Sequence, residues 1–255
     1  MKIKETLLSL LYPRHCPVCH QIVIPGGAMI CPDCEKKVSY VEEPTCLRCG
    51  KEIASPEIEY CYDCSSHTRS FRQGVALAVY DPVMRRSVAK FKNQGRMEYA
   101  DWYAQALWQR YGEQLYTWKI QAVVPVPLHP SRHRKRGYNQ AELLAERLAR
   151  QLNVPVLPKA LVRTRKTVAQ KYLGGRERQR NLESVFAPGP QAGKRIWSPG
   201  DFLFGKNLVA GKRILLVDDI YTTGSTAQAC TQVLLAAGAT EVYLASVCIG
   251  ENEGA

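Results

Sequence analysis

The sequence predicts an α/β fold, in which a mostly parallel sheet is flanked by helices and preceded by a cysteine-rich module. Apolar segments alternate with helix-prone segments from about residue 121 onward, as is typical of parallel sheets. One apolar run, at residues 214–217, leads directly into two aspartates and a hydroxyl-rich loop. Eight of the ten cysteines form four C-x-x-C pairs near the N-terminus. We therefore divide the chain into a cysteine module with a short leading helix (1–70), a bridging segment (71–120) and an α/β domain (121–255).

The length of 255 residues suits one good core with a smaller module attached. No stretch is long and apolar enough to span a membrane. Residues 1–12 predict a short amphipathic helix rather than a signal peptide, because Glu5 stands between the lysines and the leucines and no small-residue cleavage site follows. We therefore expect a cytoplasmic protein without membrane insertion.

The four cysteine pairs are spaced as metal ligands, each pair beginning fifteen residues after the one before. A C-x-x-C turn aims two thiolates at one tetrahedral ion, and two such turns complete its shell. We predict two zinc sites with structural roles, since four thiolates leave no open coordination position. The ligands are Cys16, Cys19, Cys31, Cys34, Cys46, Cys49, Cys61 and Cys64.

Some alternatives remain for this module. Disulfides are disfavoured because no secretory signal precedes the pairs, whereas iron–sulfur clusters stay an alternative. Consecutive pairs would make a tandem double ribbon and alternate pairs a cross-brace; we favour the tandem arrangement. The two remaining cysteines, Cys230 and Cys248, lie in apolar segments and are expected in the core.

The bridging segment predicts one strand and two helices. Residues 71–80 predict a strand or the start of a hairpin, with Val75, Leu77 and Val79 at alternating positions, and residues 83–91 are helix-prone, with Gly95 as the cap. Residues 99–115 form an amphipathic, aromatic-rich helix. Such a stripe is more often core than a stacking surface, but exposed members of it would suit single-stranded nucleic acid.

The α/β domain begins with a buried strand at 122–126 and a basic loop, because six of the thirteen residues 128–140 are His, Lys or Arg. Loops at the carboxyl ends of strands are where open α/β sheets bind ligands. A helix is expected at 141–152. Residues 164–180 form a second basic segment whose two adjacent glycines would let it close over a reactive site. Residues 185–186 predict a strand, and 187–209 a turn-rich inserted loop of unknown role.

Residues 214–226, which read I-L-L-V-D-D-I-Y-T-T-G-S-T, carry the most specific signal. The apolar run predicts a buried parallel strand, and the helix-prone run 227–237 implies that the loop opens a helix. Backbone N–H groups at a helix start, together with hydroxyls, cradle a phosphate. Paired acids hold ribose hydroxyls or Mg²⁺. The pattern therefore predicts a sugar-phosphate site, and it lacks the lysine of a P-loop and the three glycines of a dinucleotide fingerprint. A last strand is expected at 242–249.

The net charge of +12 is concentrated in one part of the chain. Residues 131–180 contain fourteen Lys or Arg and three Glu, a net of +11. Such a field attracts polyanions such as pyrophosphate, nucleotides or nucleic acid. A solvated basic face is the alternative interpretation.

Segment 214–226 resembles the phosphoribosyl pyrophosphate (PRPP) signature of type I phosphoribosyltransferases. The resemblance implies the type I phosphoribosyltransferase fold, with Asp218 and Asp219 on the ribose hydroxyls. It implies a 5′-phosphate loop made of Thr222, Thr223, Gly224, Ser225 and Thr226. It also implies a pyrophosphate loop and a flexible loop, with the candidates Arg132, Arg134, Lys135, Arg136, Lys166, Gln170 and Arg176.

The order of motifs over nearly the whole chain resembles the ComF/GntX family, which joins a double zinc ribbon to a phosphoribosyltransferase-type domain. The motifs are the cysteine pairs, F-K-N-Q-G, V-P-V-P-L-H…R-G-Y-N-Q, R-T-R-K-T and L-L-V-D-D-I-Y-T-T-G-S-T. The resemblance implies a role in DNA uptake, with PRPP and Mg²⁺, single-stranded DNA and other uptake proteins as partners. The insertion at 187–209 departs from the shorter pattern expected.

Two hypotheses of function follow. The first is an enzyme that transfers phosphoribose to an unidentified acceptor. The second is an adaptor that senses PRPP or a nucleotide and binds DNA without turnover. Thr222 stands where 6-oxopurine transferases carry an acid, and no cysteine follows Met1, so purine salvage and glutamine amidotransfer are disfavoured. The sequence identifies no general base.

Overall fold

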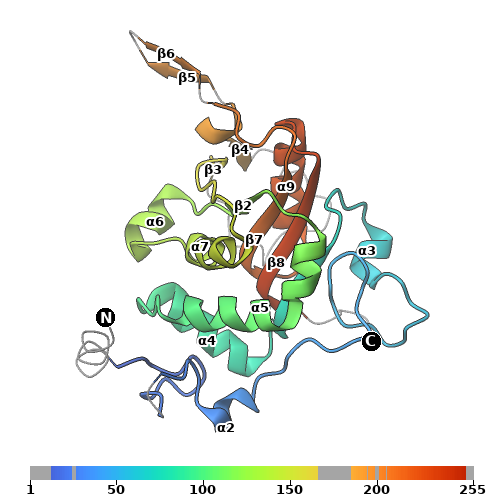
Figure 1. Ribbon diagram of the computed structural model, residues 1–255, viewed down its shortest axis with the longest axis vertical. Coiled ribbons are helices and arrows are strands. Elements are labelled where there is room, and N and C mark those ends of the chain that lie inside the picture. Colours follow the sequence, from blue (N-terminus) through green and yellow to red (C-terminus); the bar gives the residue numbers. More distant parts are fainter. Residues whose placement is uncertain are drawn as a thin grey trace.

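The computed structural model describes residues 13–24, 27–165, 185–193, 195–198, 201–204 and 206–250. A central sheet is covered by helices, and the two cysteine ribbons lie apart, the first with α2 (Pro32–Glu35) at the bottom and the second with α3 (Tyr62–Ser66) at the right (Figure 1). The leading helix predicted at 1–12 and most of the predicted flexible loop lie outside the described residues. Within the described part of the chain, no helix has both the length and the apolar character needed to cross a membrane.

The central sheet is parallel throughout, as the sequence predicts. Its strands are β1 (Gly74–Val79), β8 (Glu241–Ile249), β7 (Arg213–Tyr221) and β2 (Ala122–Pro125), in that spatial order. The register pairs Gly74 with Leu244, and Val217 with both Ala245 and Pro125. Strand β1 comes from the predicted bridging segment and yet forms an edge of this sheet. The division of the chain at residues 70 and 120 stays a prediction.

The strands contain long apolar runs because both faces of the sheet are covered. Leu215 and Val217 face one core, which also contains buried residues of helices α4 (Pro82–Asn93), α5 (Tyr99–Thr117) and α7 (Gln140–Leu152). Ile214 and Leu216 face the other core, with helix α9 (Ser225–Ala236). Cys230 and Cys248 are fully buried, one in each core, as expected for the two cysteines outside the pairs.

The helices begin where the sequence carries capping residues. The Asp81 side chain accepts a hydrogen bond from the Met84 N–H at the start of α4, and the Asn139 side chain accepts one from the Ala141 N–H at the start of α7. Tyr99 and Tyr103 of α5 are completely buried, so these members of the predicted aromatic stripe are core residues.

The predicted basic loop at 128–140 contains helix α6 (Pro130–Arg136), so the loop prediction was wrong for the seven residues of this helix. The helix begins and ends at the usual capping residues, which the prediction overlooks because it rests only on the basic composition of the segment. His129 caps it by accepting from the Ser131 N–H, Pro130 occupies its first turn, and Gly137 ends it with φ 81°.

The predicted turn-rich insertion also contains regular structure. Strand β3 (Leu161–Arg163) pairs antiparallel with β4 (Phe186–Pro188), which is followed by the short 3₁₀-helix η2 (Pro190–Ala192). Strands β5 (Arg195–Ser198) and β6 (Asp201–Phe204) form an antiparallel hairpin that projects away from the central sheet (Figure 1). These strands are rich in β-branched and aromatic residues, whose strand propensity outweighs the turn signals around them.

The two ribbons lie against opposite faces of the sheet. Cys16 and Cys34 belong to the core of α4, α5 and α7, whereas Cys46, Cys49 and Cys61 belong to the core of α9. The connecting segment crosses the edge of the sheet, where the Val41 N–H bonds to the Leu77 carbonyl and the Val79 N–H to the Ser39 carbonyl. These bonds pair the exposed edge of β1, which would otherwise be open to association.

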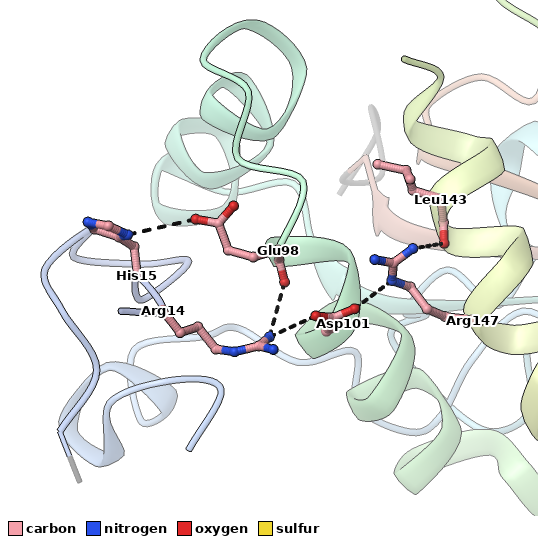
Figure 2. Close-up of polar contacts among 6 residues, drawn as sticks. All are labelled: Arg14, His15, Glu98, Asp101, Leu143 and Arg147. Carbon is pink, nitrogen blue, oxygen red and sulfur yellow. Dashed lines mark hydrogen bonds and ion pairs between the residues drawn. The ribbon is translucent and has the colours of Figure 1, made fainter. Parts of the chain in front are cut away.

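Polar contacts join the first ribbon to helix α5 (Figure 2). Arg14 Nη1 donates to Asp101 Oδ2 at 2.9 Å, and Arg147 of α7 donates from Nε to Asp101 Oδ1 at 2.6 Å. Arg14 also donates to the Glu98 carbonyl, while His15 Nδ1 lies 3.8 Å from Glu98 Oε1. Asp101 therefore links the ribbon to α7 through two arginines.

Candidate functional site

The two predicted acids lie within strand β7 rather than after it, because the strand continues to Tyr221. Successive strand residues point to opposite faces, so the acids do not lie side by side. Asp218 faces α9 and lines a pocket with the loop that follows the strand. Asp219 faces α4, where it meets a lysine. The predicted pair is therefore split between the two faces of the sheet.

Burial raises the pKa of Asp218 to about 7, and the nearby charge of Asp219 adds to this effect. The positive charges of Lys92 and Arg163, and the Asp219 N–H that donates to Asp218 Oδ1 at 2.8 Å, act in the opposite direction. A carboxyl that titrates near neutrality is typical of a functional site.

Lys92 is a site residue that sequence reasoning missed. Its Nζ lies 2.8 Å from Asp219 Oδ1, and both side chains are mostly buried. The last turn of α4 carries this lysine and is held by two residues that precede or begin α7. Gln140 Nε2 donates to the Lys92 carbonyl at 3.5 Å, and the Tyr138 hydroxyl donates to the Phe91 carbonyl. The motifs F-K-N-Q-G and R-G-Y-N-Q, noted in the sequence without a role for the lysine, thus meet beside Asp219.

The predicted phosphate loop connects β7 to α9, and Gly224 is its turning point. Gly224 has φ 74°, and a Cβ there would lie 2.2 Å from the Tyr221 hydroxyl, so only glycine fits. Thr223 Oγ1 lies 2.9 Å from Ser225 Oγ, which orders the hydroxyls at the loop. The pocket is lined by Asp218 and other residues of β7, by the loop, by Val126 directly after β2 and by residues of β8. These positions suit a phosphate at the N-terminus of α9.

Four of the basic candidates lie on α6. Arg136 is partly buried and donates from Nη1 to Gln140 Oε1 at 3.0 Å, while Arg132, Arg134 and Lys135 are exposed. Burial lowers the pKa of Arg136, and the negative charge of Asp219 opposes this shift. The positive charge of Arg136 therefore interacts with the negative charge of Asp219. Lys166, Gln170 and Arg176 lie outside the described residues.

The cysteines form two four-residue clusters, built from consecutive pairs as the tandem arrangement predicts. In each cluster the ligand atoms lie within 4.8 Å of one another. Tetrahedral zinc with Zn–S bonds of about 2.3 Å separates neighbouring sulfurs by about 3.8 Å. The Sγ atoms of Cys19 and Cys31 are 3.9 Å apart, and those of Cys49 and Cys61 are 3.6 Å apart, so both clusters fit zinc. All ten cysteines are free of disulfides.

We expect about two zinc ions per chain, because each cluster supplies one complete thiolate shell. Elemental analysis of the purified protein measures this number, and a colourless solution separates zinc from iron–sulfur clusters. Cys49→Ser, in the more buried cluster, should leave about one ion. A count of one in the unaltered protein would contradict the prediction.

Comparison with known proteins adds two domain matches. Residues 7–65 match a double zinc ribbon domain, and residues 138–255 match a phosphoribosyl transferase domain. With the parallel sheet flanked by helices, these matches confirm the predicted fold class.

Several curated proteins are similar over most of their length. The chain is 30% identical over 244 residues to DNA utilization protein YhgH of Salmonella typhimurium, and the aligned residues cover 94% of this chain and 92% of that protein. It is 28% identical over 222 residues to Competence protein F of Haemophilus influenzae, covering 84% and 88%. It is 27% identical over 247 residues to Competence protein ComFC of Streptococcus pneumoniae, covering 95% and 93%.

Proposed function

Because this chain belongs to the ComF/GntX family, which joins a double zinc ribbon to a phosphoribosyltransferase-type domain, we propose that it binds PRPP with Mg²⁺ and handles single-stranded DNA during DNA uptake. The observation that carries the proposal is one pocket in which Asp218 of β7 meets the hydroxyl-rich loop at the start of α9. A sugar phosphate needs both features, since its phosphate seeks N–H donors and its hydroxyls seek carboxylates.

The loop provides the 5′-phosphate site in this proposal. Backbone N–H groups at the start of α9 lack partners within the helix and carry the positive end of its dipole. The hydroxyls of Thr222, Thr223, Ser225 and Thr226 add donors around the same point. Gly224 lets the backbone approach the anion closely, as no side chain intervenes there.

The acids serve the ribose in this proposal. Asp218 lines the pocket and accepts from one hydroxyl in its ionised form. Asp219 lies outside this pocket and pairs with Lys92 on the other face of β7, so in this proposal the ribose lies across the carboxyl end of the strand and offers its second hydroxyl to Asp219. Lys92 and Arg136 bring positive charge close to Asp219. In a transferase, each well-placed donor would stabilise the negative charge that develops on the leaving pyrophosphate by a few kcal/mol. Mg²⁺ bound together with PRPP would neutralise part of the pyrophosphate charge.

The acceptor distinguishes the two hypotheses of function. A transferase needs a nucleophile that attacks C1 of the ribose as pyrophosphate leaves, whereas an adaptor needs only the binding energy. In this proposal Asp218 binds the ribose, and the sequence identifies no separate general base. Phosphoribosyl transfer to an unidentified acceptor and ligand sensing without turnover therefore share the same binding site and differ in the fate of the pyrophosphate.

Calorimetric titration of PRPP with Mg²⁺, combined with an assay of pyrophosphate release, tests the proposal. The release is measured with and without single-stranded DNA. Binding with DNA-stimulated release would make the protein a phosphoribosyltransferase with nucleic acid as acceptor or activator. Binding without release under either condition would make the site a sensor. Absence of binding would overturn the proposal.

Binding of single-stranded DNA should depend steeply on salt and weakly on sequence. The exposed arginines and lysine of α6 contribute to a net charge of +12 and would neutralise phosphates, and each neutralised phosphate contributes about −0.7 to the slope of log K against log salt. Arg134→Ala with Lys135→Ala should make this slope shallower, and the exposed Lys36→Ala serves as a control outside α6. An affinity that stays flat between low and moderate salt would contradict DNA binding.

A further inference from the structure

Arg69 lies where the second cysteine ribbon meets the phosphate loop. From its contacts we infer that Arg69 is a positioning residue for the 5′-phosphate cradle, and that the second cysteine cluster (Cys46, Cys49, Cys61 and Cys64) holds it there. This inference rests on the proposed PRPP site and adds to it a role for one particular zinc ribbon. Arg69 precedes β1 and is distant in sequence from the loop it contacts.

The central contact joins the Arg69 side chain to the backbone of the loop. Arg69 Nη2 donates to the Thr223 carbonyl at 2.6 Å, a short and partly buried bond from a charged donor. A trans peptide is planar, with its C=O and N–H pointing in opposite directions. Holding the Thr223 carbonyl toward the ribbon therefore turns the Gly224 N–H away from the ribbon. The guanidinium also polarises this peptide, which strengthens the N–H as a donor.

The second ribbon fixes the backbone of Arg69. Arg48 lies between Cys46 and Cys49 in the third C-x-x-C turn, and its Nη1 donates to the Arg69 carbonyl at 2.8 Å. A metal in the cluster sets the shape of this turn, because both of its cysteines are ligands. The state of the cluster is thereby linked to the position of Arg69.

Helix α9 holds the neighbouring residue from the other side. The Ser70 N–H donates to Gln228 Oε1 at 2.7 Å, and Gln228 Nε2 donates to Ser70 Oγ at 2.8 Å. Gln228 belongs to the first turn of α9, where its own N–H bonds to the Gly224 carbonyl. The ribbon, the loop and the start of α9 thus form one hydrogen-bonded unit.

Packing supports the same unit. The rings of Phe71 and Tyr221 meet edge to face with centroids 6.2 Å apart. Gly50, directly after Cys49, packs so closely on β1 that a Cβ there would lie 2.6 Å from the Gly74 carbonyl oxygen. The first ribbon makes its polar contacts elsewhere, with helix α5 through Arg14 and His15 (Figure 2). The coupling to the phosphate loop is therefore assigned to the second ribbon.

The test compares Arg69→Met with Arg72→Met in the full-length zinc-loaded protein. Arg72 is exposed and pairs only loosely with Glu241 at 3.8 Å, so its loss controls for net charge. Arg69→Met should weaken ribose 5-phosphate and PRPP about ten- to hundredfold, the usual effect of losing a charged hydrogen bond. Pyrophosphate alone should bind as before, because its site lies outside the loop. A merely structural defect would weaken all three ligands.

PRPP binding by the unaltered protein and the Arg69→Lys variant distinguish a failure of this inference from a failure of the proposed function. If the unaltered protein does not bind PRPP, the proposed function is wrong. Normal PRPP binding with equal affinities in Arg69→Met and Arg72→Met would overturn the inference alone. Arg69→Lys, which keeps the charge, should recover part of the affinity, and it replaces Arg69→Met if that variant loses zinc or fails to fold. No recovery in a folded Arg69→Lys protein with two zinc ions would also count against the inference.

Discussion

Asp218→Asn is expected to abolish PRPP binding and, above pH 7, to raise the melting temperature. The two effects have one cause. Burial raises the pKa of Asp218 to about 7, from an ordinary value of 3.8, so the folded protein resists ionising this group. Asparagine keeps the oxygen that accepts the Asp219 N–H and removes the charge. The variant therefore escapes the desolvation penalty and loses the carboxylate that the ribose requires.

The stability gain should depend on pH in a defined way. Below pH 4 the carboxyl is protonated in both the folded and unfolded states, so asparagine brings no electrostatic gain. Between pH 4 and 7 only the unfolded state of the unaltered protein ionises, and its stability falls as the pH rises. Above pH 7 the penalty is complete. Melting temperatures measured at pH 5 and pH 8 should therefore show the larger gain at pH 8.

Ligand binding provides an independent check on Asp218. PRPP affinity of the unaltered protein should weaken as the pH falls below 7, since a protonated carboxyl loses its acceptor strength. A melting temperature that drops at pH 8 in Asp218→Asn would mean that the carboxylate is well solvated or paired in the folded protein. Retained PRPP affinity in this variant would remove Asp218 from the site.

Lys92→Met is expected to have the opposite effect on stability. The Lys92 and Asp219 side chains are 21% and 12% exposed, so the methionine leaves a mostly buried carboxylate without its partner. Breaking a buried pair costs about 3–5 kcal/mol, and the partial exposure of this pair reduces the expected loss to about 2 kcal/mol. Thermal unfolding should show a fall of several degrees. Lys90→Met, in the same helical turn, is the matched control.

The same substitution should move the pH dependence of ligand binding. Lys92 lowers the pKa of Asp218, so its loss raises that pKa above 7. The pH at which half of the PRPP affinity is lost should shift upward in Lys92→Met and stay in place in Lys90→Met. Adding Asp219→Asn to Lys92→Met removes the unpaired charge and should recover stability. If stability does not recover, Lys92 stabilises the protein by some means other than its ion pair with Asp219.

Sequence patterns of short range predicted much of this protein. An unbroken apolar run identified β7 as a strand covered on both faces, and the helix-prone run after Gly224 identified α9. The spacing of the cysteine pairs identified two four-thiolate clusters, because the geometry of a C-x-x-C turn is contained within the turn itself. Basic composition was a weaker guide, since it concealed the capping residues of α6.

The tertiary structure alone decided which distant side chains serve these elements. Strand alternation determined that Asp218 and Asp219 face opposite sides, but the packing of α4 on the sheet determined that Lys92 meets Asp219. The crossing of the chain over the edge of β1 decided which ribbon reaches the phosphate loop, and so brought Arg69 to the Thr223 carbonyl. Local propensity and ligand spacing are encoded within a few residues, whereas these contacts depend on how separate layers pack. The sequence by itself therefore determined the strand, the loop and the two cysteine clusters, and the packing of helices and ribbons on the sheet determined which charged side chains lie beside them.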